Sequence, residues 1–397
     1  MKKIIITSFD LEIGGVERSL IGLLHAIDYS QYDVDLFLYA HEGEFMDMIP
    51  RHVHLLPQIE KYSMFEKPIK QVLKQKYFYI AFVRLFSKLF LFLKSKIHTD
   101  SSASLMNYYC KYSVPNLPPI SERSYDLGIS FLTPHYFLLE NVEAKKKIAW
   151  IHTDYSCISV DKNFEMKMWE KLDYIPAVSE SCKNAFIKTF PQLKNKTIVI
   201  ENTLSPEFVW QQAKLDVSDE MPKQKGVIKL CTVGRFSHAK GFDRAVLVCK
   251  KLIDLGCPIR WYAIGYGGDE PMIRAKIKET GMEHHFIILG KKTNPYPYIK
   301  ACDIYVQPSR YEGKAVTVRE AQMLYKPVVI TNFTTAASQL QDGYDGVIVP
   351  MDIEQCAEGI KAVIEDQTLQ RRLIENTKRC NYGNENEVEK IYKLMEE

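Results

Sequence analysis

The sequence lacks any strong excess of charge of one sign. Its 397 residues carry 52 Lys and Arg against 49 Asp and Glu, which gives a formal net charge of +3. A protein whose main partner is nucleic acid usually has a much stronger positive field, so this balance argues against that class. The length also exceeds an ordinary domain of ~150 residues, which excludes a single small binding module.

Paired cysteines and an export signal are missing as well. The nine cysteines are scattered and never spaced as C-x-x-C, which indicates neither a disulfide framework nor a zinc site and is typical of reduced thiols. The chain starts with only the short apolar run IIITSF before Asp10, whereas a signal peptide needs ~7 to 15 apolar residues. We therefore expect a cytoplasmic protein.

What the sequence does contain is a regular alternation of short apolar runs and longer helical patterns, repeated twice. This alternation is typical of parallel sheets built from βαβ units, and it predicts an α/β protein with two doubly wound, Rossmann-like domains that face each other across a cleft. Ligands of such sheets bind at the carboxyl ends of the strands. The predicted strands are 2–9, 33–39, 125–132, 146–152, 173–179 and 197–202, then 227–234, 260–265, 286–290, 303–309, 327–333 and 346–350.

The domain boundaries follow from a polar segment without strand pattern, residues 206–226, which is predicted to be a linker. It separates an N-terminal domain, 1–205, from a C-terminal domain, 227–380. Residues 381–397 are predicted to form a helix that packs back on the N-terminal domain.

An insert at about 60–120 interrupts the first domain and is locally basic. Between Gln58 and His98 there are nine Lys or Arg and two Glu. The apolar stretch 77–93 is shorter than the ~20 residues of a membrane-spanning helix. It fits either an interfacial helix, with Arg84, Ser87, Lys88 and Ser95 on one side, or a buried helix pair. The first interpretation makes an anionic membrane surface a partner of residues 60–98.

Two glutamates stand out in the segment DIYVQPSRYEGKAVTVREAQ, residues 303–322, which is typical of a strand, a tight loop and a helix. Glu312 and Glu320 are more than two helical turns apart, ~12 Å along the axis, on one line. The alternative is a solvated loop glutamate and a surface glutamate paired with Arg319 or Lys326. Between the two glutamates a helix start offers unpaired amides to a phosphate. These amides belong to Gly313, Lys314, Ala315 and Val316.

Two cations follow the first strand of the second domain, in VGRFSHAKGFDRA, residues 233–245. Arg235 and Lys240 could neutralise a diphosphate leaving group, a contribution that is often the largest in catalysis. For either residue alone, ordinary surface basicity would be the better interpretation. Together with the carboxylate pair they favour a phosphate-handling site.

These motifs, with IGYGGDE at 264–270 and DGYDGVIVP at 342–350, resemble the retaining, nucleotide-sugar-dependent glycosyltransferases of family 4, within the glycosyl transferases group 1 and of bacterial surface-polysaccharide type. The resemblance is strong over roughly 227–350 and weaker over the N-terminal domain. It implies the GT-B fold. One departure concerns the donor: the usual EGFG of the family is EGKA here.

The resemblance also implies roles for single residues. Arg235 and Lys240 would hold the diphosphate, Glu312 would touch the donor sugar and Glu320 the ribose. His152 would line the sugar, so Glu312, His152, Arg235 and Lys240 form the expected catalytic set. Donor binding is expected from the helix start named above and from Gly14, Gly15, Gly265 and Asn202. For Asn202 and for Ser179 a capping or turn role is equally consistent.

The expected reaction transfers a sugar from a UDP-linked donor to a saccharide or lipid-linked saccharide in surface polysaccharide biosynthesis, with retention and without metal or cofactor. The D-x-D of Asp33 and Asp35 is interpreted as solvated at a strand edge, and His284 with His285 does not have the spacing of metal ligands. Two alternatives stay open. One is a nucleotide-sugar epimerase of the same fold, and the other is a non-catalytic partner subunit.

Overall fold

The computed structural model describes residues 1–12, 14–94, 102–153, 155–156, 158, 160–312 and 315–396. The chain forms two compact units. Unit 1 consists of Met1–Leu204 and Asn384–Glu397, and unit 2 of Ser205–Gly383. Within the described ranges, no helix is both long and apolar enough to cross a membrane.

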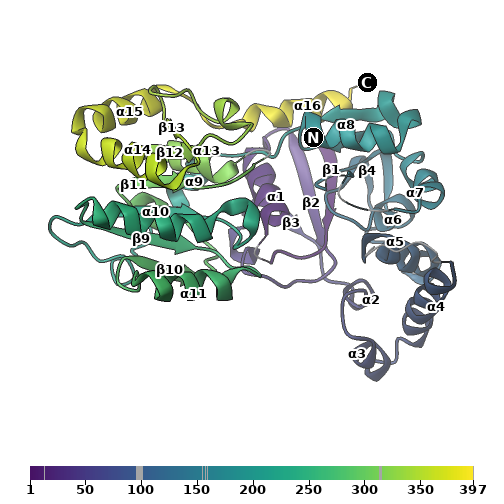
Figure 1. Cartoon of the computed structure of the whole chain (residues 1–397). Helices are drawn as coiled ribbons and strands as arrows, with labels where there is room; N and C mark the ends of the chain where they lie inside the picture. Colours follow the sequence, from purple (N-terminus) through teal and green to yellow (C-terminus); the bar gives the residue numbers. More distant parts are fainter. Residues whose placement is uncertain are drawn as a thin grey trace. The chain divides into compact units, whose positions relative to one another are not determined.

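Unit 1 is built on a parallel five-stranded sheet of order β3-β2-β1-β4-β5, drawn in purple to teal in Figure 1. A two-stranded parallel sheet, β6-β7, continues from β5 through the bridges Ile148–Tyr174 and Ile151–Ala177. The strands are β1 (Lys2–Ser8), β2 (Tyr32–Leu38), β3 (His54–Leu55), β4 (Ser124–Ser130), β5 (Glu143–Ala149), β6 (Ile175–Ala177) and β7 (Thr197–Val199). The helices outside the insert are α1 (Gly15–Ala26), α6 (Tyr136–Asn141), α7 (Lys162–Trp169), α8 (Glu180–Thr189) and α16 (Val388–Leu394).

Unit 2 has a parallel six-stranded sheet of order β10-β9-β8-β11-β12-β13. Its core lies between the sheet and helices α10, α11 and α14, where side chains of both are buried. The strands are β8 (Ile228–Val233), β9 (Ile259–Ile264), β10 (Phe286–Gly290), β11 (Ile304–Gln307), β12 (Val328–Thr331) and β13 (Val347–Val349). The helices are α9 (Pro206–Gln212), α10 (Phe242–Asp254), α11 (Glu270–Thr280), α12 (Tyr296–Ala301), α13 (Val316–Met323), α14 (Ile353–Glu365) and α15 (Gln367–Arg379).

The strand order of unit 2 defines where its ligands bind. From β8 the chain builds outward through β9 and β10, and it then returns to the other side of β8 with β11. The direction of winding therefore reverses between β8 and β11, and such a switch point leaves a crevice at the carboxyl ends of the two strands. The loops after β8 and β11 are the ones that carry Lys240 and Glu312.

The strands predicted from the sequence are present, but the predicted linker at 206–226 is wrong. Its first residues form α9, which belongs to unit 2. Ser205 caps this helix by accepting a hydrogen bond from the Phe208 amide, 3.3 Å long, and Pro206 occupies the first turn. Phe208 and Val209 are buried, so the segment is a packed helix rather than a free connection.

The insert forms α2 (Glu60–Ser63), α3 (Ile69–Lys74), α4 (Phe78–Lys94) and α5 (Ser102–Ser113), and it shares the core of unit 1. The polar side that we expected to face lipid is directed inward. The Arg84 guanidinium donates to the carbonyl oxygens of Met64, at 2.8 Å, and Lys67, at 2.6 Å, and Ser87 is buried. The expected lipid contact of Arg84 is therefore wrong, because the guanidinium satisfies two backbone carbonyls instead. Ser95 and residues 96–98 lie outside the described residues.

The D-x-D interpretation is also wrong. Asp35 is buried, and its carboxylate accepts hydrogen bonds from Arg123 Nη1, at 2.9 Å to each oxygen, and from the Tyr125 hydroxyl, at 2.5 Å. Arg123 pairs with Asp33 as well. Because Arg123 reaches both aspartates from the residue before β4, the motif closes a buried ion cluster and is not a solvated edge.

Candidate active site

The site is built from the two loops that follow β8 and β11. After β8 the chain passes through a short 3-10 turn, His238–Lys240, and then Gly241, whose φ of +68 belongs to the left-handed region. A Cβ on Gly241 would lie 2.3 Å from the Pro308 carbonyl oxygen of the neighbouring loop. Glycine therefore lets the two loops approach each other closely.

The two loops are joined by Arg310. Its guanidinium forms two hydrogen bonds with the Asp243 carboxylate, of 2.8 and 2.6 Å, and one with the His238 carbonyl oxygen, of 2.8 Å. Burial alone would raise the pKa of Asp243, but the Arg310 guanidinium holds it below its ordinary value. A bidentate pair of this kind fixes geometry as well as charge.

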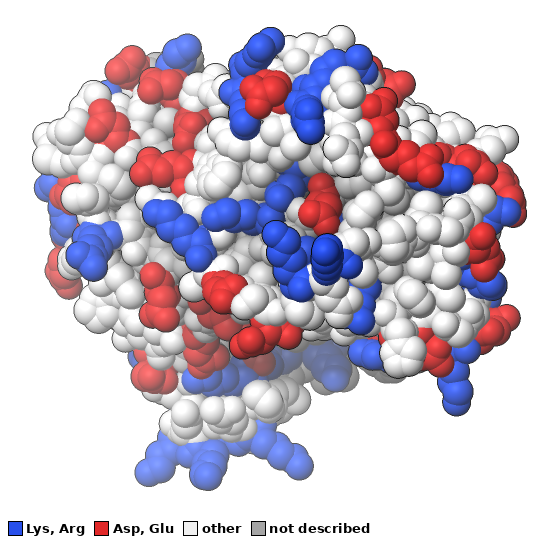
Figure 2. Space-filling model, turned by 90° about the vertical axis from the view of Figure 1, so that its left-hand side faces the viewer, with Lys and Arg blue, Asp and Glu red and all other residues white. Residues whose placement is uncertain are grey.

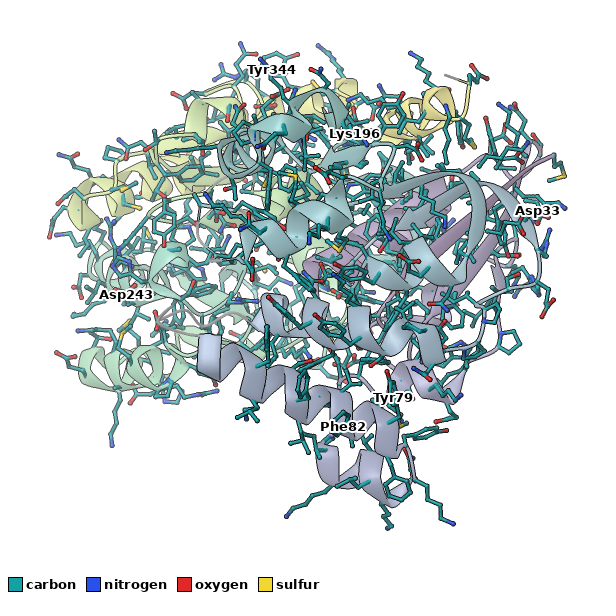
Figure 3. All side chains as sticks on the ribbon, turned by 90° about the vertical axis from the view of Figure 1, so that its right-hand side faces the viewer. Asp33, Tyr79, Phe82, Lys196, Asp243 and Tyr344 are labelled. Atoms are coloured by element: carbon teal, nitrogen blue, oxygen red, sulfur yellow. The ribbon has the colours of Figure 1, made fainter. Side chains whose placement is uncertain are left out.

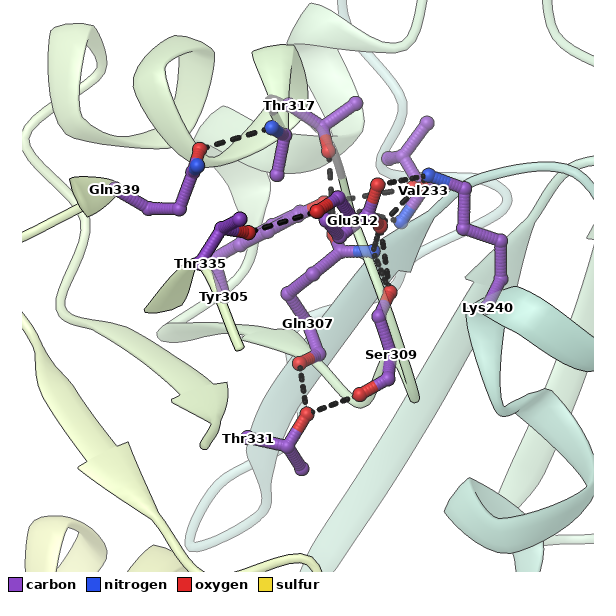
Figure 4. A network of polar contacts seen from close by, with 11 residues as sticks. Val233, Lys240, Tyr305, Gln307, Ser309, Glu312, Thr317, Thr331, Thr335 and Gln339 are labelled. Carbon is purple, nitrogen blue, oxygen red and sulfur yellow. Dashed lines mark hydrogen bonds and ion pairs between the residues drawn. The ribbon is translucent and has the colours of Figure 1, made fainter. Parts of the chain in front are cut away.

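Lys240 and Glu312 meet where the loops join (Figure 4). Lys240 Nζ lies 2.6 Å from Oε1 and 2.7 Å from Oε2 of Glu312, whose side chain is only 5% exposed. The same carboxylate accepts hydrogen bonds from Ser309 Oγ, at 2.6 Å, and from Gln307 Nε2, at 3.2 Å. The structure thus brings together two residues of the predicted catalytic set that are 72 positions apart.

Further contacts fix the backbone of this loop. Thr335 donates to the Glu312 carbonyl oxygen at 2.7 Å, and the Ala315 amide donates to Gln339 Oε1 at 2.9 Å. The Ala315 amide, predicted to be open to a phosphate, is therefore already occupied by a side chain. The Val316 amide lies at the first position of α13. Gly313 and Lys314 lie outside the described residues.

Glu320 faces a different neighbour. It is fully buried on α13, and Oε1 accepts a hydrogen bond of 3.0 Å from the Tyr296 hydroxyl. The alternative of two solvated glutamates is wrong, because both carboxylates are enclosed, and Lys326 donates to the Cys302 carbonyl oxygen. The contact of Glu320 with a ribose stays a prediction.

The glycine-rich loop after β9 packs against the loop after β8. Gly265 has a φ of +152, and a Cβ there would lie 1.8 Å from the Gly234 carbonyl oxygen. Three backbone hydrogen bonds link the two loops, from Gly234 to Ile264, from Phe236 to Tyr266 and from Asp269 to Phe236. Gly265 therefore shapes the loop that presents Arg235. The Arg235 side chain is exposed and has no hydrogen bond or ion pair among the described residues.

The remaining predicted residues belong to unit 1. Gly14 precedes α1, and a Cβ on it would lie 1.9 Å from Glu17 Oε2, so this carboxylate covers the glycine. Burial raises the pKa of Glu17. Gly15 is open. Ser179 caps α8 through the Cys182 amide, which explains its place without a ligand. Asn202 is held at its carbonyl oxygen by the Asn384 amide, at 3.0 Å.

His152 lies beyond β5, beside the carboxyl ends of the strands of unit 1. Its ring stacks at an angle on Phe131, with 4.7 Å between the centroids. Burial lowers its pKa to about 4, and that of the neighbouring His135 to about 3. His152 is therefore a neutral imidazole at neutral pH, able to accept or donate a hydrogen bond but not to act as a cation. Its contact with a donor sugar stays a prediction.

Sequence reasoning missed the residues that hold Glu312 in place. Ser309 and Gln307 were within the motif, and both end or follow a buried strand, which is a usable signal. Gln339 and Thr335 come from a separate loop after β12, and nothing in the sequence connects them to position 312. In the part of the chain that the structure describes, no group of three or more His, Cys, Asp or Glu side chains could hold a metal ion.

The two doubly wound parallel units give the chain the GT-B fold. The structure resembles that of Anabaena HepE solved with UDP and glucose, with a TM-score of 0.64, 17% identity and complete coverage of both chains. It also resembles TarM of S. aureus, solved with UDP and two saccharides, with a TM-score of 0.66, 13% identity and complete coverage of both chains.

Sequence comparisons agree with the fold. Residues 215–380 match the model of the family Glycosyl transferases group 1. An uncharacterized glycosyltransferase of Methanocaldococcus jannaschii is 26% identical, over 64% of each chain. The undecaprenol-linked N-acetylgalactosaminyltransferase of Campylobacter jejuni is 26% identical, over 53% of this chain and 56% of its own. The matches thus span less than two thirds of these relatives, and they support a GT-B glycosyltransferase.

Proposed function

We propose that the protein is a retaining family 4 glycosyltransferase that moves a sugar from a UDP-linked donor to a saccharide or lipid-linked saccharide acceptor. The observation that carries the proposal is the Lys240–Glu312 pair at the switch point of unit 2, where a cation and an enclosed carboxylate stand side by side. One group fits a diphosphate and the other fits sugar hydroxyls. UDP is the nucleotide in the HepE and TarM complexes, which supports the choice of donor.

In the proposed reaction, Lys240 and Arg235 stabilise the negative charge that develops on the leaving diphosphate. The bond between the anomeric carbon and the diphosphate oxygen breaks, and its electron pair leaves with UDP. The acceptor hydroxyl forms the new bond on the same face, and its proton passes to a phosphate oxygen of the departing UDP. Such preorganised charges need no metal or cofactor to be effective, which is the proposal for this site.

The role of Glu312 in this scheme is to position the sugar. Its carboxylate is fixed by Lys240, Ser309 and Gln307, so it is poorly placed to move and form a covalent bond. Its remaining acceptor capacity suits the hydroxyls of a hexose. The surface polysaccharide context rests on relatives such as the capsular polysaccharide glycosyltransferase of Staphylococcus aureus, 25% identical over 52% of this chain.

A thermal-shift screen of UDP-, GDP- and ADP-sugars tests the donor, because a ligand that binds the native state raises its apparent stability. We expect a shift with a UDP-sugar in the wild type and a reduced shift with Lys240→Ala. The matched control, Lys250→Ala, removes a lysine that pairs with Asp254 on the surface of α10. Absence of any nucleotide-sugar shift would contradict the proposal.

Product analysis separates transfer from the alternatives. A nucleotide-sugar epimerase would change the donor sugar without an acceptor, whereas a transferase releases UDP only as the acceptor is consumed. A non-catalytic partner subunit would do neither. NMR of the new glycosidic linkage reports whether the anomeric configuration is retained.

A further inference from the structure

Helix α4 presents an apolar face that no described part of the chain covers. Phe78 is 62% exposed, Phe82 64% and Leu89 55%. Leu85, Phe86, Tyr79 and Phe90 are between 40% and 51% exposed. With 3.6 residues per turn, these seven side chains fall within an arc of about 140° of the helix surface. A continuous apolar stripe of this width on a soluble domain indicates a binding surface.

The opposite side of α4 fixes this orientation. Ile80, Ala81, Val83 and Ser87 are buried, and the Arg84 guanidinium holds the loop before α3 through two backbone carbonyls. Helix α4 packs along α5, and Figure 3 shows the pair near the lower edge of unit 1, with Tyr79 and Phe82 labelled. The helix therefore cannot rotate its apolar face inward without breaking these contacts.

Exposed lysines flank the apolar face. Lys70, Lys74 and Lys76 lie on or just after α3, and Lys88 lies on α4 beside the apolar arc. None of the four forms an ion pair with a described residue, and the seven residues of the arc include no acid. Figure 2 shows Lys and Arg side chains around uncharged surface at the lowest part of the view, the height at which α3 lies in Figure 1.

We infer that α4 is a docking helix that inserts its apolar face into an anionic lipid bilayer surface. Aromatic and aliphatic side chains would enter the boundary between headgroups and acyl chains, while the lysines contact lipid phosphates. Phe and Tyr suit this layer because their rings tolerate it on both the wet and the apolar side. The seventeen residues of α4 lie along the surface and do not span it.

The charges favour a lipid surface over a second copy of the chain. If two copies met through this face, eight lysines would come together with no acid among the residues of either arc. Like charges brought together in this way are destabilising, whereas an anionic surface compensates each of them. The inference stands apart from the proposed function, since it uses only residues of the insert and needs no donor.

Flotation of the full-length protein with lipid vesicles tests the inference. We compare vesicles of phosphatidylcholine alone with vesicles of phosphatidylcholine and phosphatidylglycerol in equal parts. The wild type should float with the anionic vesicles, and more weakly as salt is raised. Two variants remove one contribution each. Phe82→Ser with Phe86→Ser should lower binding by about tenfold per side chain, and Lys70→Glu with Lys74→Glu and Lys76→Glu by at least about fivefold per lysine.

Matched controls alter the same kinds of residue elsewhere. Leu215→Ser with Met272→Ser removes two exposed apolar side chains of unit 2, and Lys214→Glu with Lys223→Glu and Lys225→Glu changes the net charge by the same amount. Both controls should float like the wild type. The substituted residues are exposed, and circular dichroism checks that each variant is folded.

Several results would overturn the inference. These are a wild type that does not float, equal flotation with both kinds of vesicle, or unchanged flotation of the double phenylalanine variant. A wild-type dimer that Phe82→Ser with Phe86→Ser converts to a monomer would instead identify a second copy as the occupant. The UDP-sugar thermal shift of the same variants reports separately on the proposed function, and we expect it to be unchanged.

Discussion

Lys240 Nζ bridges both carboxylate oxygens of Glu312, at 2.6 and 2.7 Å, although the two residues come from different loops of unit 2. The pair is largely enclosed, with the glutamate side chain 5% exposed and the lysine side chain 27% exposed. Removing one partner of such a pair leaves the other charge poorly compensated, so each residue depends on the other for its position.

Lys240→Ala and Glu312→Gln should each lower kcat/KM for sugar transfer by about a hundredfold to a thousandfold, the effect of losing one preorganised charge contact to the transition state. Steady-state release of UDP measures the loss, and circular dichroism checks that the fold is intact. Lys250→Ala should behave like the wild type. Transfer at nearly wild-type rates by both site variants would refute the assignment.

Ser309→Ala should lower kcat about tenfold, or ~1.4 kcal/mol, because a hydrogen bond to a charged group is lost. Ser309 Oγ donates to Glu312 Oε1 at 2.6 Å and is buried, so it acts by positioning that carboxylate. We expect little change in the donor KM, which a purely structural defect would not preserve. Ser338→Ala, at an exposed serine, is the control. A variant with wild-type kcat would show that Glu312 does not need this contact.

Gly265→Ala should destabilise unit 2 by roughly 2 kcal/mol or more, since it combines an unfavourable φ with a clash against backbone. The added Cβ would meet the Gly234 carbonyl oxygen at 1.8 Å, and that oxygen cannot move without disturbing the end of β8. Gly268→Ala, where nothing lies within 4 Å, should be nearly neutral. Thermal unfolding of the two variants measures the difference, and equal Tm values would contradict the expected strain.

His152 makes the stability of unit 1 sensitive to acid. Burial lowers its pKa from an ordinary value of 6.5 to about 4. Between these values the unfolded chain binds a proton that the folded chain does not, so acidification lowers the free energy of unfolding by about 1.4 kcal/mol per pH unit. The loss begins near pH 6.5 and is complete below about 4.

The variant His152→Asn should therefore lose about 2 kcal/mol less than the wild type between pH 7 and pH 5. Urea unfolding at both pH values gives the two differences. His284→Asn, at an exposed histidine, should follow the wild type. Identical pH dependence of the wild type and His152→Asn would show that the imidazole is not buried as the structure has it.

Much of the fold could be predicted from the sequence because buried parallel strands have a strong local signature. Runs such as KKIIITSF and VIKLCTVG are apolar on both faces, and their neighbours in the sheet follow from the alternation with helices. The pairing of Lys240 with Glu312 was predictable in part, since both follow strands that the winding rule brings together.

The failures share a physical cause, which is that side-chain direction depends on tertiary partners. Spacing alone placed Arg84 on a lipid-facing side of its helix, but two backbone carbonyls of the α2–α3 connection turn it inward. In the same way, Asp35 is buried only because Arg123, 88 residues further along, reaches it. The predicted linker failed because Ser205 and Pro206 start a helix that packs on unit 2.

The return of the chain to unit 1 has a consequence for its synthesis. Tyr392 of α16 stacks on Tyr32 with 4.0 Å between ring centroids, and its hydroxyl accepts a hydrogen bond of 2.9 Å from the Asp28 amide. Unit 1 therefore cannot assemble fully on the ribosome before residues 384–396 have emerged, whereas unit 2, a continuous segment, can mature while its predecessor still waits for its final helix.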